Sequence, residues 1–183
     1  MLIRVFISIP LKDPGILEAP LKDVAGLRNT RASPASQSHI TLRFIGDMDD
    51  GKVKKVVRCV EDAVVGIPPF AVVIKGSGCF PDRKRPSVVW VGAEPQDTLR
   101  ALADRISANL KAANINFDSK PFKSHITIGR CKGPTDVDGF LEKYRDAEFG
   151  SFLCEDICVM RSELGPRGAK HTVLARIRLP DAV

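Results

Sequence analysis

Two copies of the tetrapeptide Ser-His-Ile-Thr give two of the three histidines in this chain the same neighbours. One copy contains His39 and the other His125. With ordinary amino-acid composition, a second histidine would carry the same three neighbours about once in several thousand cases. Histidine has the side chain whose unperturbed pKa lies closest to neutral pH, so a matched pair can supply a general acid and a general base. The repeat therefore indicates a two-histidine acid–base site.

Each histidine is followed two positions later by a threonine, Thr41 in the first copy and Thr127 in the second. In an extended strand, residues two apart lie on the same face. A strand therefore places each histidine beside a hydroxyl group, while the isoleucine between them faces a core. Such hydroxyls can donate hydrogen bonds to oxygens on which negative charge builds. The pattern predicts a cleft lined by two imidazoles and two hydroxyls.

Length and composition are those of one globular domain. The chain has 183 residues, of which 44% are apolar and 27% charged, which is ordinary for a folded domain with a sizeable core. No apolar run approaches the ~18–20 residues that span a bilayer. The start of the chain favours a first strand over a signal peptide. These observations predict a cytoplasmic protein that does not enter a membrane.

The net charge of the chain suggests a class of binding partner, and its cysteine content suggests the redox state of its compartment. The 28 basic and 22 acidic side chains give a net charge of +6. Each basic cluster taken alone favours a solvated loop, whereas a basic surface beside a catalytic pair suits a polyanion such as RNA or DNA. The five cysteines lack the C-x-x-C spacing of metal or redox motifs, and no acidic cluster accompanies the histidines. The sequence therefore predicts structural thiols in a reducing compartment and neither a metal nor a cofactor.

Strand-like and helix-like segments mix along the chain. Segments rich in Val, Ile and Phe and bounded by Gly, Pro or Asp predict strands over residues 2–9, 39–45, 70–75, 87–91, 125–130, 152–160 and 172–179. Apolar residues at three- and four-residue spacing predict helices over 50–65 and 96–114. Weaker patterns predict a helix over 15–27 that Pro20 interrupts and a short one over 137–144. Residues 28–37 are polar and predict a mobile loop.

The second motif begins 86 residues after the first, close to half the chain length. This spacing favours a diverged internal duplication within one domain over residues 1–183. The predicted fold class is α+β and bilobal, with two similar lobes that face each other across a cleft.

Both motifs resemble a known family. Ser-His-Ile-Thr-Leu-Arg-Phe-Ile-Gly over 38–46 and Pro-Phe-Lys-Ser-His-Ile-Thr-Ile-Gly-Arg over 121–130 look like the two H-x-T-x signatures of the two-histidine phosphoesterases. The chain more narrowly resembles the LigT-like RNA 2′,3′-cyclic phosphodiesterases, historically called 2′–5′ RNA ligases. Residues 5–9, 78–81, 86–92 and 161–166 also look like segments of that family, so the resemblance covers nearly the whole chain. It departs near His171, where the family commonly carries an aromatic residue.

The resemblance implies a fold and a function. The implied fold is bilobal α+β, with an antiparallel sheet flanked by helices in each lobe and the two motifs opposed in the active-site cleft between them. The resemblance also implies metal-independent opening of RNA 2′,3′-cyclic phosphate ends to 2′-phosphates, with His39 as proton donor and His125 as proton acceptor. Local sequence alone does not distinguish the two roles, because the motifs are nearly identical. A ribose 5′-hydroxyl in place of water would reverse the reaction into 2′–5′ ligation. The implied partner is RNA with a cyclic phosphate end, such as a tRNA fragment, and the protein is expected to be a monomer.

Three further residues are candidate substrate contacts. Strand parity puts Arg43 on the face of His39 and makes it a candidate phosphate ligand. The same parity turns Arg130 away from His125 unless the strand bulges, whereas the resemblance favours a phosphate contact. Phe80 is a candidate for stacking on a base, as is Trp90, although aromatic residues more often pack in a core. His171 stands apart from both motifs and is not assigned to the site.

Two other functions compete with this enzyme. One is a non-catalytic single-stranded RNA-binding module, which would bind in a salt-sensitive way without turnover. The other is an enzyme that acts on small cyclic nucleotides or ADP-ribose cyclic phosphates, whose activity would not rise with oligonucleotide length.

Overall fold

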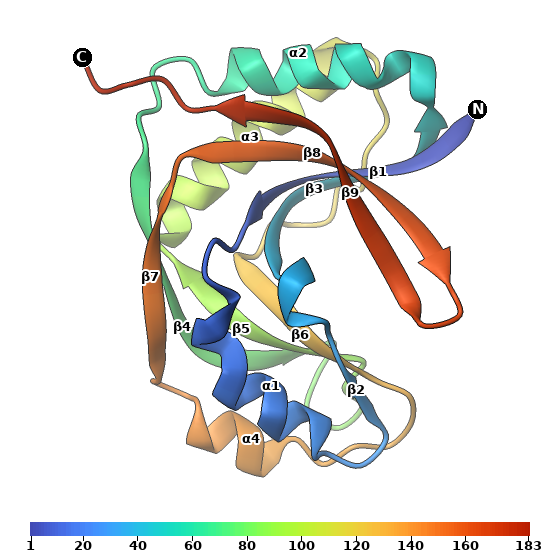
Figure 1. Ribbon diagram of the computed structural model, residues 1–183, viewed down its shortest axis with the longest axis vertical. Coiled ribbons are helices and arrows are strands. Elements are labelled where there is room, and N and C mark those ends of the chain that lie inside the picture. Colours follow the sequence, from blue (N-terminus) through green and yellow to red (C-terminus); the bar gives the residue numbers. More distant parts are fainter.

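The computed structural model describes residues 1–183 and contains one curled antiparallel sheet with helices on its outer faces (Figure 1). The strand order is β7-β4-β5-β6-β3-β1-β8-β9, with β2 paired to β6. The predicted α+β class is confirmed. The strands are β1 Leu2–Pro10, β2 Thr30–Ala32, β3 His39–Asp49, β4 Phe70–Phe80, β5 Val88–Glu94, β6 His125–Cys131, β7 Glu148–Cys154, β8 Asp156–Gly165 and β9 Gly168–Arg178.

The helices lie at opposite ends of the molecule (Figure 1). α2, Val53–Ala63, packs against α3, Gln96–Ala112, and α3 covers β3. α1, Glu18–Ala25, covers β6 and lies close to α4, Asp138–Lys143. Single 3₁₀ turns occupy Pro14–Leu17, Ala35–Gln37 and Asp50–Lys52. None of the helices combines the length and the apolar character needed to span a membrane.

The two motif strands meet in the middle of the sheet. β3 and β6 pair only at Ile40 opposite Ile126, and both isoleucines are fully buried. These are the isoleucines that follow His39 and His125, so the pairing places the two motifs side by side. Internal duplication and a division into two lobes remain predictions.

A β-bulge follows the first motif. Thr41 lies opposite Ser8 of β1, whereas Arg43 lies opposite Ile7, so Leu42 is an extra residue in β3. One extra residue exchanges the two faces of the strand beyond it. Arg43 therefore faces α3 and no longer shares the face of Thr41.

A second bulge occupies the same position in the second motif. Thr127 lies opposite Trp90 of β5 and Gly129 opposite Val89, so Ile128 is an extra residue in β6. Gly129 then faces α1, where a Cβ at this position would lie 2.3 Å from Cγ1 of Val24. The next residue along β6 is consequently turned to the opposite face.

The structure corrects three predicted elements. The single strand predicted over 152–160 is two strands, β7 and β8, which pair with β4 and β1 and are separated by Glu155. The loop predicted over 28–37 contains β2 and a 3₁₀ turn, because β2 hydrogen-bonds to β6. Pro20 does not interrupt the first helix, since it lies in the first turn of α1, where the backbone N–H groups have no intrahelical acceptor.

Candidate active site

His39 and His125 are anchored in the same way. Nδ1 of His39 lies 2.7 Å from the carbonyl oxygen of Gln37, and Nδ1 of His125 lies 2.7 Å from that of Lys123. A carbonyl oxygen only accepts hydrogen bonds, so Nδ1 carries the proton in both rings. Nε2 is then the free nitrogen, which accepts a proton when the ring is neutral and donates one when it is charged. Each motif therefore presents one Nε2 for proton transfer.

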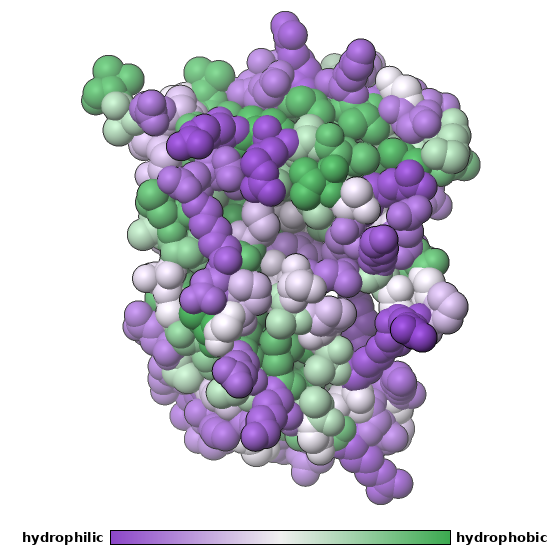
Figure 2. All heavy atoms as spheres, viewed as in Figure 1, coloured by the Kyte–Doolittle hydropathy of each residue, from purple (hydrophilic) through white to green (hydrophobic).

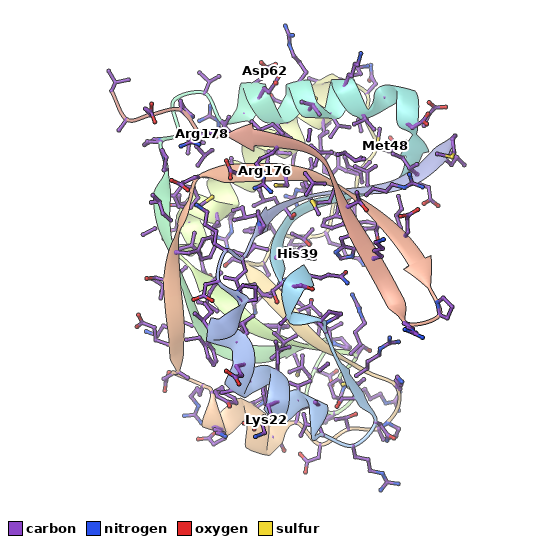
Figure 3. The ribbon with its side chains drawn as sticks, viewed as in Figure 1. Lys22, His39, Met48, Asp62, Arg176 and Arg178 are labelled. Carbon is purple, nitrogen blue, oxygen red and sulfur yellow. The ribbon has the colours of Figure 1, made fainter.

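Aromatic side chains hold both imidazoles in place. The ring of Phe6 is centred 4.9 Å from that of His39, and the ring of Phe80 is centred 5.0 Å from that of His125. Trp90 lies 6.0 Å from His125 and 5.4 Å from Phe80. Phe80 thus packs beside the site, where it orients His125 from one side. Figure 3 shows His39 at the centre of the viewed face, between the upper and lower parts of the sheet.

Burial keeps both histidines neutral near pH 7 in the free protein. Burial lowers the pKa of His39 to about 4, and the positive charges of His171, His125 and Arg130 act in the same direction. Burial also lowers the pKa of His125, and the charge of Lys123 adds to this effect. A histidine that donates a proton must first gain one, which an anionic ligand favours because a nearby negative charge raises the pKa.

Arg130 reaches the cleft because of the bulge in β6. It is exposed, whereas Ile126 and Ile128 are fully buried. Its charge lowers the pKa of both His39 and His171. Simple strand parity was therefore wrong for this residue, and the bulge is the physical reason.

Arg43 does not lie beside the histidines, because its guanidinium group binds other residues of the protein. Nε donates a hydrogen bond to Oγ of Ser107, and Nη1 donates to the carbonyl oxygen of Lys120 at 3.1 Å. Nη2 lies 3.6 Å from the carboxylate of Asp104. Ser107 and Asp104 belong to α3, which the bulge at Leu42 makes Arg43 face. The parity argument that assigned Arg43 to phosphate fails for this reason.

His171 lies beside His39, although nothing in the sequence pattern pointed to it. It belongs to β9, opposite Ser162 of β8. Its ring is centred 5.2 Å from that of His39 and 4.8 Å from that of Phe6. Its Nδ1 is buried without a hydrogen-bond partner. All three histidines of the chain therefore gather at one site, because the register of the β8–β9 hairpin brings position 171 there.

The two threonines of the motifs lie on the same strands as the histidines. Thr41 and Thr127 precede the bulges in β3 and β6 and are partly buried. No group of three or more His, Cys, Asp or Glu side chains in the protein is arranged so that it could hold a metal ion.

Hydrophilic side chains cover much of the face that carries the β8–β9 hairpin, with hydrophobic atoms between them (Figure 2).

The site has the features of a two-histidine protein. One antiparallel sheet joins two H-x-T strands, and the histidine of each strand is anchored through Nδ1. The family model of the 2′-5′ RNA ligase superfamily matches residues 16–166. This chain belongs to that superfamily.

Individual relatives match over nearly the whole chain. A Methanothermobacter thermautotrophicus protein named RNA 2′,3′-cyclic phosphodiesterase is 30% identical over 191 residues, with 98% of this chain and 100% of the relative covered. An Archaeoglobus fulgidus protein of the same name is 30% identical over 90% of this chain and 94% of its own length. The crystal structure of the Thermus thermophilus protein TT0787 superposes with a TM-score of 0.83 at 28% identity, over 97% of this chain and 98% of that one.

Proposed function

We propose that this protein is an enzyme that hydrolyses RNA 2′,3′-cyclic phosphate ends to 2′-phosphates without a metal ion. The observation that carries this proposal is the matched anchoring of His39 and His125, which leaves one Nε2 on each motif strand for proton transfer. The name of the two relatives, RNA 2′,3′-cyclic phosphodiesterase, supports the same chemistry.

In the proposed reaction, Nε2 of His125 accepts a proton from water as the water oxygen attacks phosphorus. The bond between phosphorus and O3′ breaks, and Nε2 of His39 donates its proton to O3′. The product carries a 2′-phosphate and a free 3′-hydroxyl, with His125 protonated and His39 neutral. Proton exchange with solvent then restores the starting state. The roles of the two histidines follow the family resemblance.

Hydroxyl donors would stabilise the charge that develops on the non-bridging oxygens. The hydroxyls of Thr41 and Thr127 share their strand faces with the histidines. Donors that are in position before the reaction stabilise such charge without reorganisation. Arg130, which the bulge in β6 turns towards the cleft, contacts a phosphate of the substrate in this proposal.

The lowered pKa of His39 adds a requirement. Its ring is neutral in the free protein at pH 7, so the proton that it donates must arrive together with the anionic substrate. The negative charge of the cyclic phosphate raises the pKa of a neighbouring imidazole. Substrate binding would therefore also favour the protonated form of His39, which is the form that acts as the general acid. The rate profile would be bell-shaped, with apparent pKa values that belong to the coupled pair.

The same site would also catalyse ligation, with a ribose 5′-hydroxyl as the nucleophile in place of water. Its oxygen would attack phosphorus, the bond between phosphorus and O3′ would break with protonation of O3′, and the product would be a 2′–5′ phosphodiester. Finer assignments, namely a tRNA fragment as substrate, a monomeric state and a cytoplasmic location, are also proposals.

The test is the product of a short RNA that ends in a 2′,3′-cyclic phosphate, incubated in excess EDTA and analysed by phosphorus NMR. A 2′-phosphate product supports the proposal. A 3′-phosphate product would keep the two-histidine chemistry but reverse the orientation of the substrate. RNA binding without turnover at any pH between about 5 and 9 would instead indicate the binding module.

A further inference from the structure

A second arginine lies beside Arg130 on the short strand β2. Arg31 is directly opposite Arg130 in the antiparallel pair of β2 and β6, so both side chains leave the sheet on the same face. Both are exposed, and neither forms a salt bridge. Like charges directly opposite each other destabilise a strand pair. An anion between the two guanidinium groups would remove this repulsion.

The guanidinium of Arg31 lies against the turn of the β8–β9 hairpin. A Cβ placed on Gly168 would be 3.4 Å from Nη2 and 3.6 Å from Cζ of Arg31. Gly168 has a φ of +108°, which other residues adopt only with strain. The guanidinium of Arg31 therefore lies within van der Waals reach of the hairpin turn, between β2 and the hairpin. Figure 1 shows the tip of this hairpin above β2.

The two arginines lie at some distance from the histidines of the proposed active site, on the same face of the sheet. Arg130 follows His125 on the same strand. Their partners in β5, Val88 and Gly92, are four residues apart, which at about 3.3 Å per residue puts Arg130 about 13 Å from His125 along the sheet. After the bulge in β6 it shares the face of His125. Arg31 is one strand further out, about 4.8 Å from β6. On the hairpin side, Gly168 precedes His171 by three residues. A phosphate near Arg31 is therefore a different one from the phosphate that reacts.

We propose that Arg31, together with Arg130, binds the phosphodiester that links the terminal cyclic nucleotide to its 5′ neighbour. This inference rests on the proposed function and narrows its substrate class to oligonucleotides. A guanidinium offers two parallel N–H donors that match two phosphate oxygens, and two guanidinium groups can neutralise one phosphodiester from both sides. A cyclic mononucleotide lacks this phosphodiester and gains nothing from Arg31.

The experiment compares three substrates in the wild type and in Arg31→Gln. The substrates are a nucleoside 2′,3′-cyclic phosphate, a dinucleotide that ends in a cyclic phosphate, and the same dinucleotide with a neutral methylphosphonate linkage. We expect Arg31→Gln to lower kcat/KM for the charged dinucleotide about tenfold or more. The other two substrates should be unaffected.

Two further variants serve as controls. Arg58→Gln on the exposed side of α2 makes the same change in net charge away from the cleft and should leave all three values unchanged. Arg31→Lys keeps the charge but loses the two-pronged geometry, so it should restore only part of the activity. Equal losses on all three substrates, or no loss on the charged dinucleotide, would overturn the role of Arg31.

A binding measurement separates this inference from the proposed function. Calorimetry measures the affinity for a dinucleotide that ends in a 2′-phosphate, whether or not the protein turns over its substrate. If the charged dinucleotide binds Arg31→Gln more weakly than the wild type, and the methylphosphonate analogue binds both proteins equally, the phosphodiester site is supported even if no hydrolysis is seen. Unchanged affinity would reject the site, whatever the activity.

Discussion

The neutral state of the partly buried His39 should make the protein less stable in mild acid. Its pKa is about 4 in the folded protein, against 6.5 for an unperturbed histidine. Between these two values the unfolded chain binds a proton that the folded protein excludes. The stability that this difference provides is fully present above pH 6.5 and is lost as the pH falls towards 4.

The magnitude follows from the two pKa values. Each pKa unit corresponds to ~1.36 kcal/mol, and integration from pH 7 to pH 5 gives a loss of about 1.8 kcal/mol in the free energy of unfolding from His39 alone. His39→Asn removes this titration. Its amide nitrogen can replace Nδ1 as the donor to the carbonyl oxygen of Gln37, which is 2.7 Å away in the wild type.

Urea denaturation of both proteins at pH 7 and pH 5 measures the effect, with the single tryptophan, Trp90, as the fluorescent probe. We expect the stability of His39→Asn relative to the wild type to improve by about 1.8 kcal/mol from pH 7 to pH 5. His125 and His171 titrate in both proteins, so their contributions largely cancel. A relative stability that changes by less than about 0.5 kcal/mol would refute the assignment of a neutral His39 in the folded protein.

Three more predictions concern the site and its supports. A nucleoside 2′-phosphate should raise the pKa of His39 by at least about one unit, because its negative charge favours the charged ring; NMR titration of the ring proton with and without the ligand measures this, and an unchanged pKa would contradict it. Arg43→Ala should lower the free energy of unfolding by about 1–3 kcal/mol and leave kcat/KM within about threefold of the wild type, because it contacts α3; a loss of activity without a loss of stability would reverse that assignment. Gly78→Ala should cost about 1–3 kcal/mol in urea denaturation, because its Cβ would lie 2.1 Å from Cζ2 of Trp90; wild-type stability would contradict the packing.

Local sequence rules predicted the part of the site that lies within one undisturbed stretch of strand. His39 with Thr41, and His125 with Thr127, each span two residues, and no bulge falls between them. Alternation of side chains along a strand was therefore enough to place them. The α+β class and the valine stripe of α2 followed from periodicity in the same way.

The same rule failed where the strand gained one residue. The bulges at Leu42 and Ile128 exchange the faces beyond each motif, which turns Arg43 towards α3 and Arg130 towards the cleft. Whether a strand bulges depends on its pairing with β1 or β5, and this pairing is a tertiary property.

Two residues near the site carried no local signal. His171 reaches His39 only through the register of β9 on β8, and Arg31 faces Arg130 only because β2 adds to β6. Both depend on contacts between residues far apart in the chain. The polar composition of residues 28–37 favoured a loop, whereas the free edge of β6 supplied a hydrogen-bonding partner for β2.

The most direct test of the two-histidine mechanism is single-turnover hydrolysis of an RNA oligonucleotide that ends in a 2′,3′-cyclic phosphate. The wild type is compared with His39→Ala and His125→Ala, and affinity for the product oligonucleotide is measured in parallel. We expect each substitution to slow the reaction by about 10²–10⁴-fold while binding is retained. A rate within about tenfold of the wild type in either variant would contradict the mechanism.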